Sequence, residues 1–93
     1  MTDPMTSLES LAAQVEAADE LDNSLDVLVE IALFKPGGVY SSCRSNAAGT
    51  KVIYTDPRGR DVTCWAQDWT KDRLTTAAAL RARARSLVGE GEA

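Results

Sequence analysis

The chain has 93 residues, of which 44% are hydrophobic and 26% are charged, and its formal net charge is −4 at pH 7. This size and composition predict one small globular domain over residues 1–93. The absence of histidine removes the commonest general base, proton shuttle and metal ligand, and the acidic balance argues against nucleic acid as the main partner. Because a single core of this size is marginal, self-association as a homodimer is an open alternative.

Two features of the sequence predict a cytoplasmic protein. The first residues, MTDPMTSLES, have neither the basic nor the apolar region of a signal peptide. The longest apolar run, Leu25–Phe34, is too short to span a bilayer, so we expect no membrane association. Cys43 and Cys64 should then be reduced. Since no histidine could serve them as a base or as a fellow ligand, we interpret both as small buried hydrophobes.

Helical periodicity predicts two helices after a flexible tail over residues 1–5. The first helix begins at Thr6, where Thr6-Ser7-Leu8-Glu9 has the form of a capping box. Its apolar stripe is formed by Leu8, Leu11, Ala12, Val15 and Ala18. Asp22-Asn23-Ser24 supplies a break and a new N-cap. The second helix covers Leu25–Phe34, although its β-branched residues also permit a strand, and one continuous helix over Ser7–Phe34 is the alternative.

Alternating residues and turn signals predict an antiparallel three-stranded meander in the centre of the chain. The three strands are Val39–Arg44, Lys51–Thr55 and Asp61–Trp65. The turn between the last two is Asp56-Pro57-Arg58-Gly59, since Pro suits its second position and Gly permits a positive φ. Alternation places Val52 and Tyr54 on one face of the second strand. In the third strand it places Trp65 on the face opposite Cys64.

A last helix is predicted to begin with an N-cap at Asp68 or Thr70 and to end at Gly89, before a flexible tail over residues 90–93. The residues predicted to face the core are Leu74, Ala77, Leu80, Ala84, Leu87 and Val88. The element order is therefore ααβββα, which predicts an α+β fold with helices packed on a small antiparallel sheet.

Trp65 and Trp69 are the strongest candidates for contact with a partner. Two tryptophans at a strand-to-helix junction are costly to expose and are effective interface anchors; the alternative is that they cover the sheet or fill the end of the core. The acidic residues predicted to join them in a partner contact are Glu9, Glu16, Asp19 and Glu20. No residue pattern marks a catalytic, cofactor or metal site, so we expect a non-enzymatic protein without a cofactor.

The alternative function is nucleic-acid binding through the cations of the last helix and its start. These cations are Lys71, Arg73, Arg81 and Arg85. Arg81 and Arg85 share one helix face, but their position in the C-terminal half also fits compensation of the helix dipole. A protein of this second class would bind DNA or RNA in a salt-dependent manner.

The segment NAAGTKVIYTDPRGRDVTCWAQDWTKDRLTTAAALRARA resembles a family of short phage and prophage proteins, some of them named phage ABA-sandwich proteins. Members open with an acidic helix that ends near a Leu-Asp pair, as at Leu21-Asp22. They carry a short two- or three-stranded sheet and close with an alanine-rich helix that contains a stretch like Leu80-Arg81-Ala82-Arg83-Ala84. The resemblance implies a phage or prophage origin and supplies no catalytic residues.

Together these features predict a small phage protein that binds a host or phage protein. An inhibitor of a host defence complex, such as an anti-CRISPR protein, is the specific form that we expect from the size, the acidic charge, the absence of histidine and the phage resemblance. A self-associating structural domain is a further alternative, because the second predicted helix is apolar on most of its circumference.

Overall fold

The computed structural model describes the backbone of residues 4–92 and the side chains of residues 7–86. Its elements, in chain order, are α1 (Pro4–Ala17), α2 (Asn23–Leu33), β1 (Ser42–Ser45), β2 (Val52–Thr55), β3 (Asp61–Cys64), the 3₁₀ turn η1 (Trp69–Lys71) and α3 (Arg73–Glu92). The predicted α+β fold and the order ααβββα are therefore confirmed. No helix in the described part of the chain is long and apolar enough to cross a membrane.

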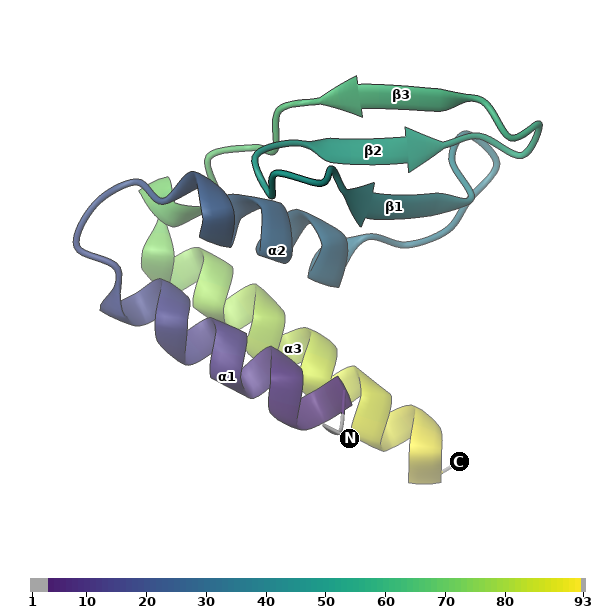
Figure 1. The fold of residues 1–93 in the computed structure, drawn as a ribbon. Coiled ribbons are helices and arrows are strands. Elements are labelled where there is room, and N and C mark those ends of the chain that lie inside the picture. Colours follow the sequence, from purple (N-terminus) through teal and green to yellow (C-terminus); the bar gives the residue numbers. More distant parts are fainter. Residues whose placement is uncertain (1–3, 93) are drawn as a thin grey trace.

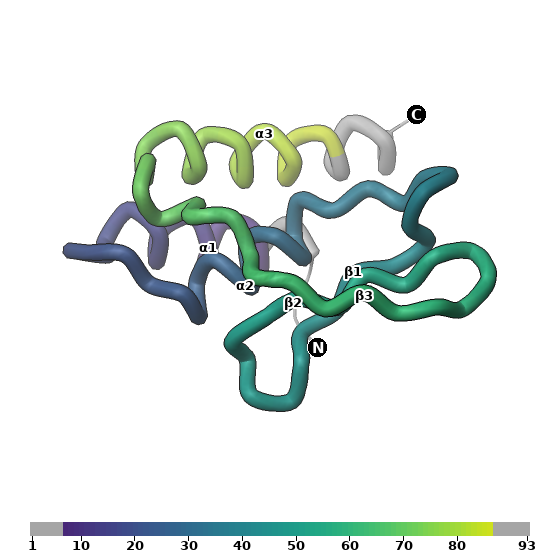
Figure 2. The backbone as a smooth tube through the Cα atoms, turned by 90° about the horizontal axis from the view of Figure 1, so that it is seen from above, coloured from purple at the N-terminus to yellow at the C-terminus, as the bar shows by residue number. Residues whose placement is uncertain are grey.

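The molecule is built in layers, with α2 in the middle (Figure 1). The antiparallel sheet, in the order β1-β2-β3, lies on one side of α2, and the helices α1 and α3 lie on the other. Figure 2, seen from above the sheet, shows α3 running alongside α1. Because α2 covers one face of the sheet, the other face is left without a helix from residues 4–92.

The break between α1 and α2 separates two helices, which removes the alternative of one continuous helix. Asp22 is the N-cap of α2, and its carboxylate accepts a hydrogen bond of 3.1 Å from the backbone N–H of Leu25. The helix ends at Leu33, and Phe34 already has extended backbone angles. The proline at position 36 favours this ending, because it keeps the residue before it out of the helical region.

Two tight turns fix the register of the sheet. In the first, the Asn46 carboxamide accepts hydrogen bonds from the backbone N–H groups of Thr50 and Lys51. In the second, the Asp56 carboxylate accepts from the backbone N–H groups of two residues in the turn. Gly59 has a φ of 84°, the left-handed conformation that glycine adopts without strain. The resulting pairs place Val52 opposite Cys64 and Ile53 opposite Thr63.

Two hydrophobic clusters lie on opposite sides of α2. The larger joins the three helices and contains Leu8, Leu11, Ala12, Val15, Val29, Ala77, Leu80 and Ala84. The smaller joins α2 to the sheet through Val27, Val52 and Ala66. Alternate faces of α2 are thus buried against different layers, which explains why its sequence is apolar on most of its circumference.

Several predicted boundaries are wrong. Helix α1 begins at Pro4 rather than at Thr6, because proline fits the first helical position. Strand β1 begins at Ser42 because the preceding residues form a turn, in which the N–H of Gly37 donates to the carbonyl of Tyr40. The flexible tails predicted for 1–5 and 90–93 fall partly outside the described residues, and within them positions 4–5 and 90–92 are helical.

The start and end of α3 also differ from the prediction. Neither Asp68 nor Thr70 caps it; Asp72 does, accepting a hydrogen bond from the N–H of Thr75. The helix continues through Gly89, since glycine is tolerated inside a helix at a cost of about 1 kcal/mol. Leu74 is 75% exposed because it lies roughly 100° around the helix from its buried face. The predicted burial of Leu87 and Val88 falls outside the described side chains.

Candidate functional site

The open face of the sheet carries the most exposed aromatic side chain among the described residues. Trp65 follows β3 directly and is 66% exposed. Six further residues share this face of the sheet: Arg44, Lys51, Ile53, Thr55, Asp61 and Thr63. Val52, on the opposite face, is fully buried under α2. We call Trp65 and the six residues that share its face the open sheet face, in which Trp65 lies at one end.

Charged groups on the open sheet face are arranged around Trp65 and Asp61. The Lys51 ammonium lies 4.6 Å from the centre of the Trp65 ring, within the range of a cation–π interaction. At the other end, Arg44 forms an ion pair of 2.9 Å with Asp61 and donates a hydrogen bond to Thr55. The Thr55 hydroxyl and then the Arg44 guanidinium hold the pKa of Asp61 below its usual value. The face therefore carries a cation beside the tryptophan, and in its middle row Ile53 lies between Arg44 and Thr63.

Trp69, the second predicted anchor, is placed inside the fold. Its ring packs against the larger hydrophobic cluster, and its indole N–H donates a hydrogen bond of 2.6 Å to the Glu30 carboxylate. The same carboxylate accepts hydrogen bonds from the Tyr54 hydroxyl and from the backbone N–H of Gln67. Burial and the bond to Glu30 raise the pKa of Tyr54 well above 10. The structure thus gives the two tryptophans different surroundings: Trp65 faces solvent, whereas Trp69 joins α2 to the segment before α3.

Acidic residues along α2 hold this segment in place. Asp26 is only 3% exposed, and its carboxylate accepts hydrogen bonds of 2.7 and 2.9 Å from the backbone N–H and the hydroxyl of Thr70. The Thr70 hydroxyl in turn accepts from the backbone N–H of Asp22. Asp22, Asp26 and Glu30 recur every four residues, so they form one stripe on α2. The four-residue spacing was visible in the sequence, but the partners of Asp26 and Glu30 were not: Thr70 lies 44 residues after Asp26, and Trp69 lies 39 residues after Glu30.

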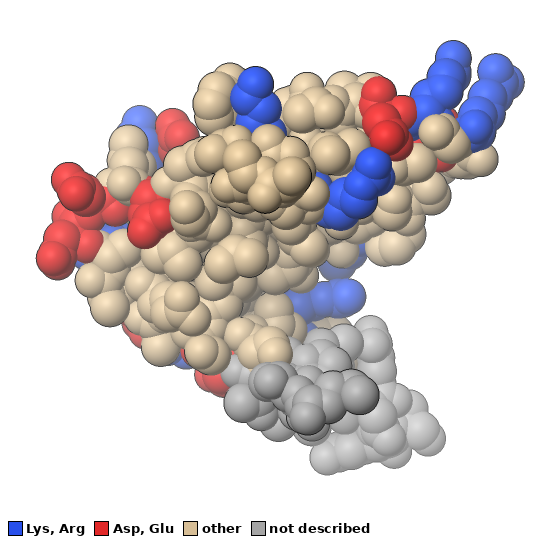
Figure 3. All heavy atoms as spheres, viewed as in Figure 1, with Lys and Arg blue, Asp and Glu red and all other residues tan. Residues whose placement is uncertain are grey.

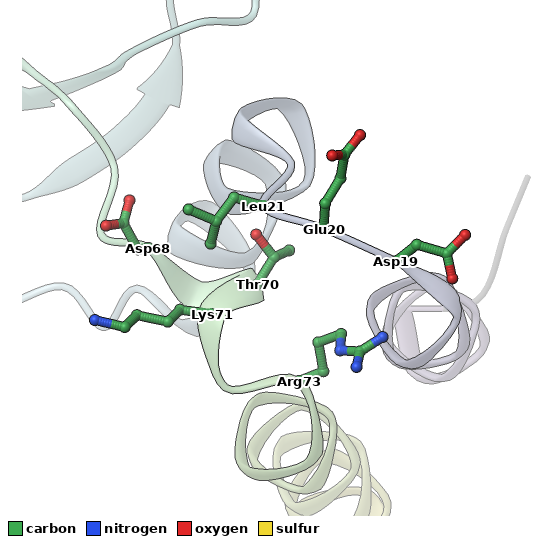
Figure 4. Close-up of a pocket in the computed structure, with 7 residues that line it drawn as sticks. All are labelled: Asp19, Glu20, Leu21, Asp68, Thr70, Lys71 and Arg73. Atoms are coloured by element: carbon green, nitrogen blue, oxygen red, sulfur yellow. The ribbon is translucent and has the colours of Figure 1, made fainter.

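The four acidic residues predicted to contact a partner fall into two groups. Glu9 and Glu16 both pair with Arg81 of α3, and the hydrogen bond from Arg81 lowers the pKa of Glu16. These two side chains therefore join α1 to α3. Asp19 and Glu20 are exposed and line a shallow hollow of about 330 Å³ at the end where α1 leads into α2 (Figure 4).

The hollow combines carboxylates with two cations and an exposed leucine. Its lining residues are Asp19, Glu20, Leu21, Asp68, Thr70, Lys71 and Arg73. Arg73 donates a hydrogen bond to the backbone carbonyl of Ala18, which fixes this side chain against the end of α1. In the part of the chain that the structure describes, no group of three or more His, Cys, Asp or Glu residues could hold a metal ion.

The cations of the nucleic-acid alternative do not form one basic surface. Arg81 is engaged by two carboxylates of α1, and Lys71 and Arg73 lie in the hollow beside Asp19, Glu20 and Asp68. Arg85 is exposed on α3. Continuous phosphate binding needs neighbouring, available cations, and the carboxylates interrupt this set.

The two cysteines are half-buried and free, on the face of the sheet that α2 covers. Burial, followed by the nearby Glu30 carboxylate, raises the pKa of the Cys43 thiol, which keeps it protonated and a poor nucleophile. This environment agrees with the prediction that both residues pack as small apolar side chains.

No protein-family model matches the chain, and neither the curated proteins nor the solved structures contain a match. The resemblance to short phage proteins therefore stays a prediction from the sequence. A proposal about function therefore depends on the fold and on the chemistry of its surfaces.

Proposed function

We propose that the protein is a non-enzymatic binding protein that uses the open sheet face to contact another protein, with Trp65 as the anchor. The observation that carries this proposal is the exposure of Trp65 on a sheet face that no helix of residues 4–92 covers. Tryptophan is enriched among the residues that dominate the free energy of protein–protein binding. The proposal keeps Trp65 from the predicted contact set and assigns Trp69, Glu9 and Glu16 to the stability of the fold.

The internal contacts of the fold support this division. Trp69 has its hydrogen-bond acceptor and its apolar neighbours within the chain, so folding alone accounts for it. Among the described residues, Trp65 has the Lys51 ammonium over its ring, and it leaves about two-thirds of its surface in water. A partner that covers Trp65 would remove a large aromatic surface from water, and burying such a side chain stabilises a complex by about 2 kcal/mol.

Affinity capture from a bacterial lysate tests the proposal with three immobilised proteins: the wild type, Trp65→Ala and Leu74→Ala. Leu74 is the matched control, because it is also an exposed apolar side chain but lies on α3. We expect a protein that the wild type and Leu74→Ala retain and that Trp65→Ala loses. With the purified partner, calorimetry should show an affinity about thirtyfold lower for Trp65→Ala. Equal retention by Trp65→Ala would refute the proposal.

The biological role proposed for this binding is inhibition of a host defence complex, which the size, the acidic charge, the absence of histidine and the phage resemblance together favour. The expected target is then a component of such a complex among the retained proteins, and mass spectrometry of the captured fraction would identify it. If Trp65-dependent capture retains a protein of another class, the binding function stands and the defence-inhibitor role fails.

A further inference from the structure

Charge is distributed unevenly between the sheet and the helical layers. Residues 39–65, which contain the sheet, carry four cations and two carboxylates, whereas the rest of the chain carries six cations and twelve carboxylates. Figure 3 shows several blue cations over the sheet and its hairpin, with red carboxylates also at the hairpin, and a group of red carboxylates over the end where α1 leads into α2. Although the net charge of the whole chain is −4, the sheet segment over residues 39–65 has a net positive charge.

We propose that the open sheet face binds an acidic protein segment that places an apolar side chain on Trp65 and a carboxylate beside Lys51. This inference rests on the proposed function and names the chemistry of its partner. It differs from the sequence-based expectation that acidic residues of this chain contact the partner. The reason is geometric: the acidic side chains Glu9 and Glu16 of α1 pair with Arg81 of α3, while the Lys51 ammonium lies over the exposed tryptophan.

The residues around Trp65 define what the partner must supply. The Lys51 ammonium lies over one side of the ring, so a carboxylate placed there would gain an ion pair next to the apolar contact. Ile53 is half-buried and Thr63 is its cross-strand partner on the same face. Together they form an uncharged part of the surface between Trp65 and Arg44, which is the other cross-strand partner of Ile53.

A single-stranded nucleic acid is also anionic, but the surface suits it less well. Such ligands stack successive bases on several aromatic side chains and neutralise a row of phosphates. Among the described residues, the open sheet face has one aromatic side chain, and its Arg44 guanidinium is already bound by Asp61 and Thr55. An acidic peptide needs only one apolar anchor and one or two cations, which this surface provides.

Titrations with short synthetic peptides test the inference. The probes are a peptide of alternating Glu and Leu, its versions with Gln or Lys in place of Glu, and an oligothymidylate. The readout is the indole N–H signal of Trp65 in a nitrogen–proton correlation spectrum; the Trp69 signal is an internal reference, because its N–H is bonded to Glu30. We expect the Glu peptide to bind about tenfold more tightly than the Gln peptide, and the Lys peptide to leave the Trp65 signal unchanged.

Variants identify the cation responsible. Lys51→Glu should weaken binding of the Glu peptide at least about tenfold, whereas Lys71→Glu, the same change in the acidic hollow, should not. Circular dichroism of both variants checks that they are folded. Raised salt should weaken the Glu peptide more than the Gln peptide, because screening acts on the charge pair.

Each other outcome overturns the inference in a distinct way. Equal binding of the Glu and Gln peptides at Trp65 would remove the acidic requirement while leaving protein binding through Trp65 in place. Tighter binding of the oligothymidylate would assign the face to nucleic acid. Failure of every probe to shift the Trp65 signal would overturn the inference, and the lysate capture would then decide separately whether Trp65 binds a protein.

Discussion

Glu30 is the side chain whose removal should disturb this fold most for its size. Its carboxylate accepts hydrogen bonds from the Tyr54 hydroxyl, the Trp69 indole N–H and the Gln67 backbone N–H, so it joins α2 to the sheet and to the segment before α3. A hydrogen bond to a charged group contributes about 1.5–3 kcal/mol, and part-buried donors left without an acceptor add to the loss. We expect Glu30→Ala to lower the free energy of unfolding by about 3 kcal/mol. The total for a chain of this length is roughly 5–14 kcal/mol.

Urea denaturation monitored by tryptophan fluorescence measures this loss. Glu30→Gln, which keeps one acceptor oxygen but no charge, should lose about 1 kcal/mol, and Glu20→Ala, at an exposed position, should change stability by less than about 0.5 kcal/mol. The melting temperature of Glu30→Ala should fall by about 15 °C. A loss below about 1 kcal/mol in Glu30→Ala would refute the view that this carboxylate connects the layers.

The same contact predicts how stability depends on alkaline pH. Burial and the Glu30 carboxylate raise the folded-state pKa of Tyr54 above its ordinary value of 10. At a pH between the ordinary pKa of 10 and the folded-state pKa, Tyr54 keeps its proton in the folded state and has lost it in the unfolded state. The contribution to stability is therefore fully present below pH 10 and is lost as the pH rises through the folded-state pKa. Ultraviolet titration of phenolate should show Tyr54 ionising at lower pH in Glu30→Gln than in the wild type.

Three further predictions follow from the same contacts. Trp69→Ala should lower the free energy of unfolding by about 3 kcal/mol, because the ring packs in the core. Trp65→Ala should lower it by less than about 1 kcal/mol, because this side chain is exposed. Equal losses in chemical denaturation would contradict a buried Trp69 and an exposed Trp65. Asp26→Ala should cost about 2–3 kcal/mol, since it leaves the buried N–H and hydroxyl of Thr70 without their acceptor, and amide hydrogen exchange should accelerate at Thr70 first. The pKa of Asp61 is lowered from 3.8, so its contribution to stability is present above pH 3.8 and is lost as the pH falls through the folded-state value; carboxyl NMR should show this late protonation.

The sequence was sufficient to predict the element order and the two faces of the sheet, because both depend on local periodicity. Helical spacing separates the helices from the strands, and alternation within Lys51–Thr55 already puts Val52 on the face opposite Ile53. The boundaries of α3 were harder to predict, since Asp68, Thr70 and Asp72 are all good N-caps. Only the burial of Thr70 against Asp26 decides that the helix begins later.

The different positions of the two tryptophans could not be predicted from local pattern. Alternation places Trp65 on the outer face, but Trp69 follows an irregular segment in which no period fixes the direction of a side chain. Its direction is set by Glu30, thirty-nine residues earlier in the chain. Long-range hydrogen bonds of this kind depend on how the layers pack, which the spacing of residues along the chain does not reveal.

The carboxylates show why the net charge of a chain is a poor guide to the charge of one of its surfaces. Several of them have structural partners within the chain: Asp26 and Glu30 hold the segment before α3, and Glu9 and Glu16 bind Arg81. A carboxylate engaged in this way still counts toward the net charge of −4, but it presents little free charge to a second molecule. The chemistry of a surface on a sheet depends instead on the side chains that the alternation of the strands places on that face. On the open sheet face these residues place a cation against the exposed tryptophan, and the acidic partner that we propose would complement that arrangement.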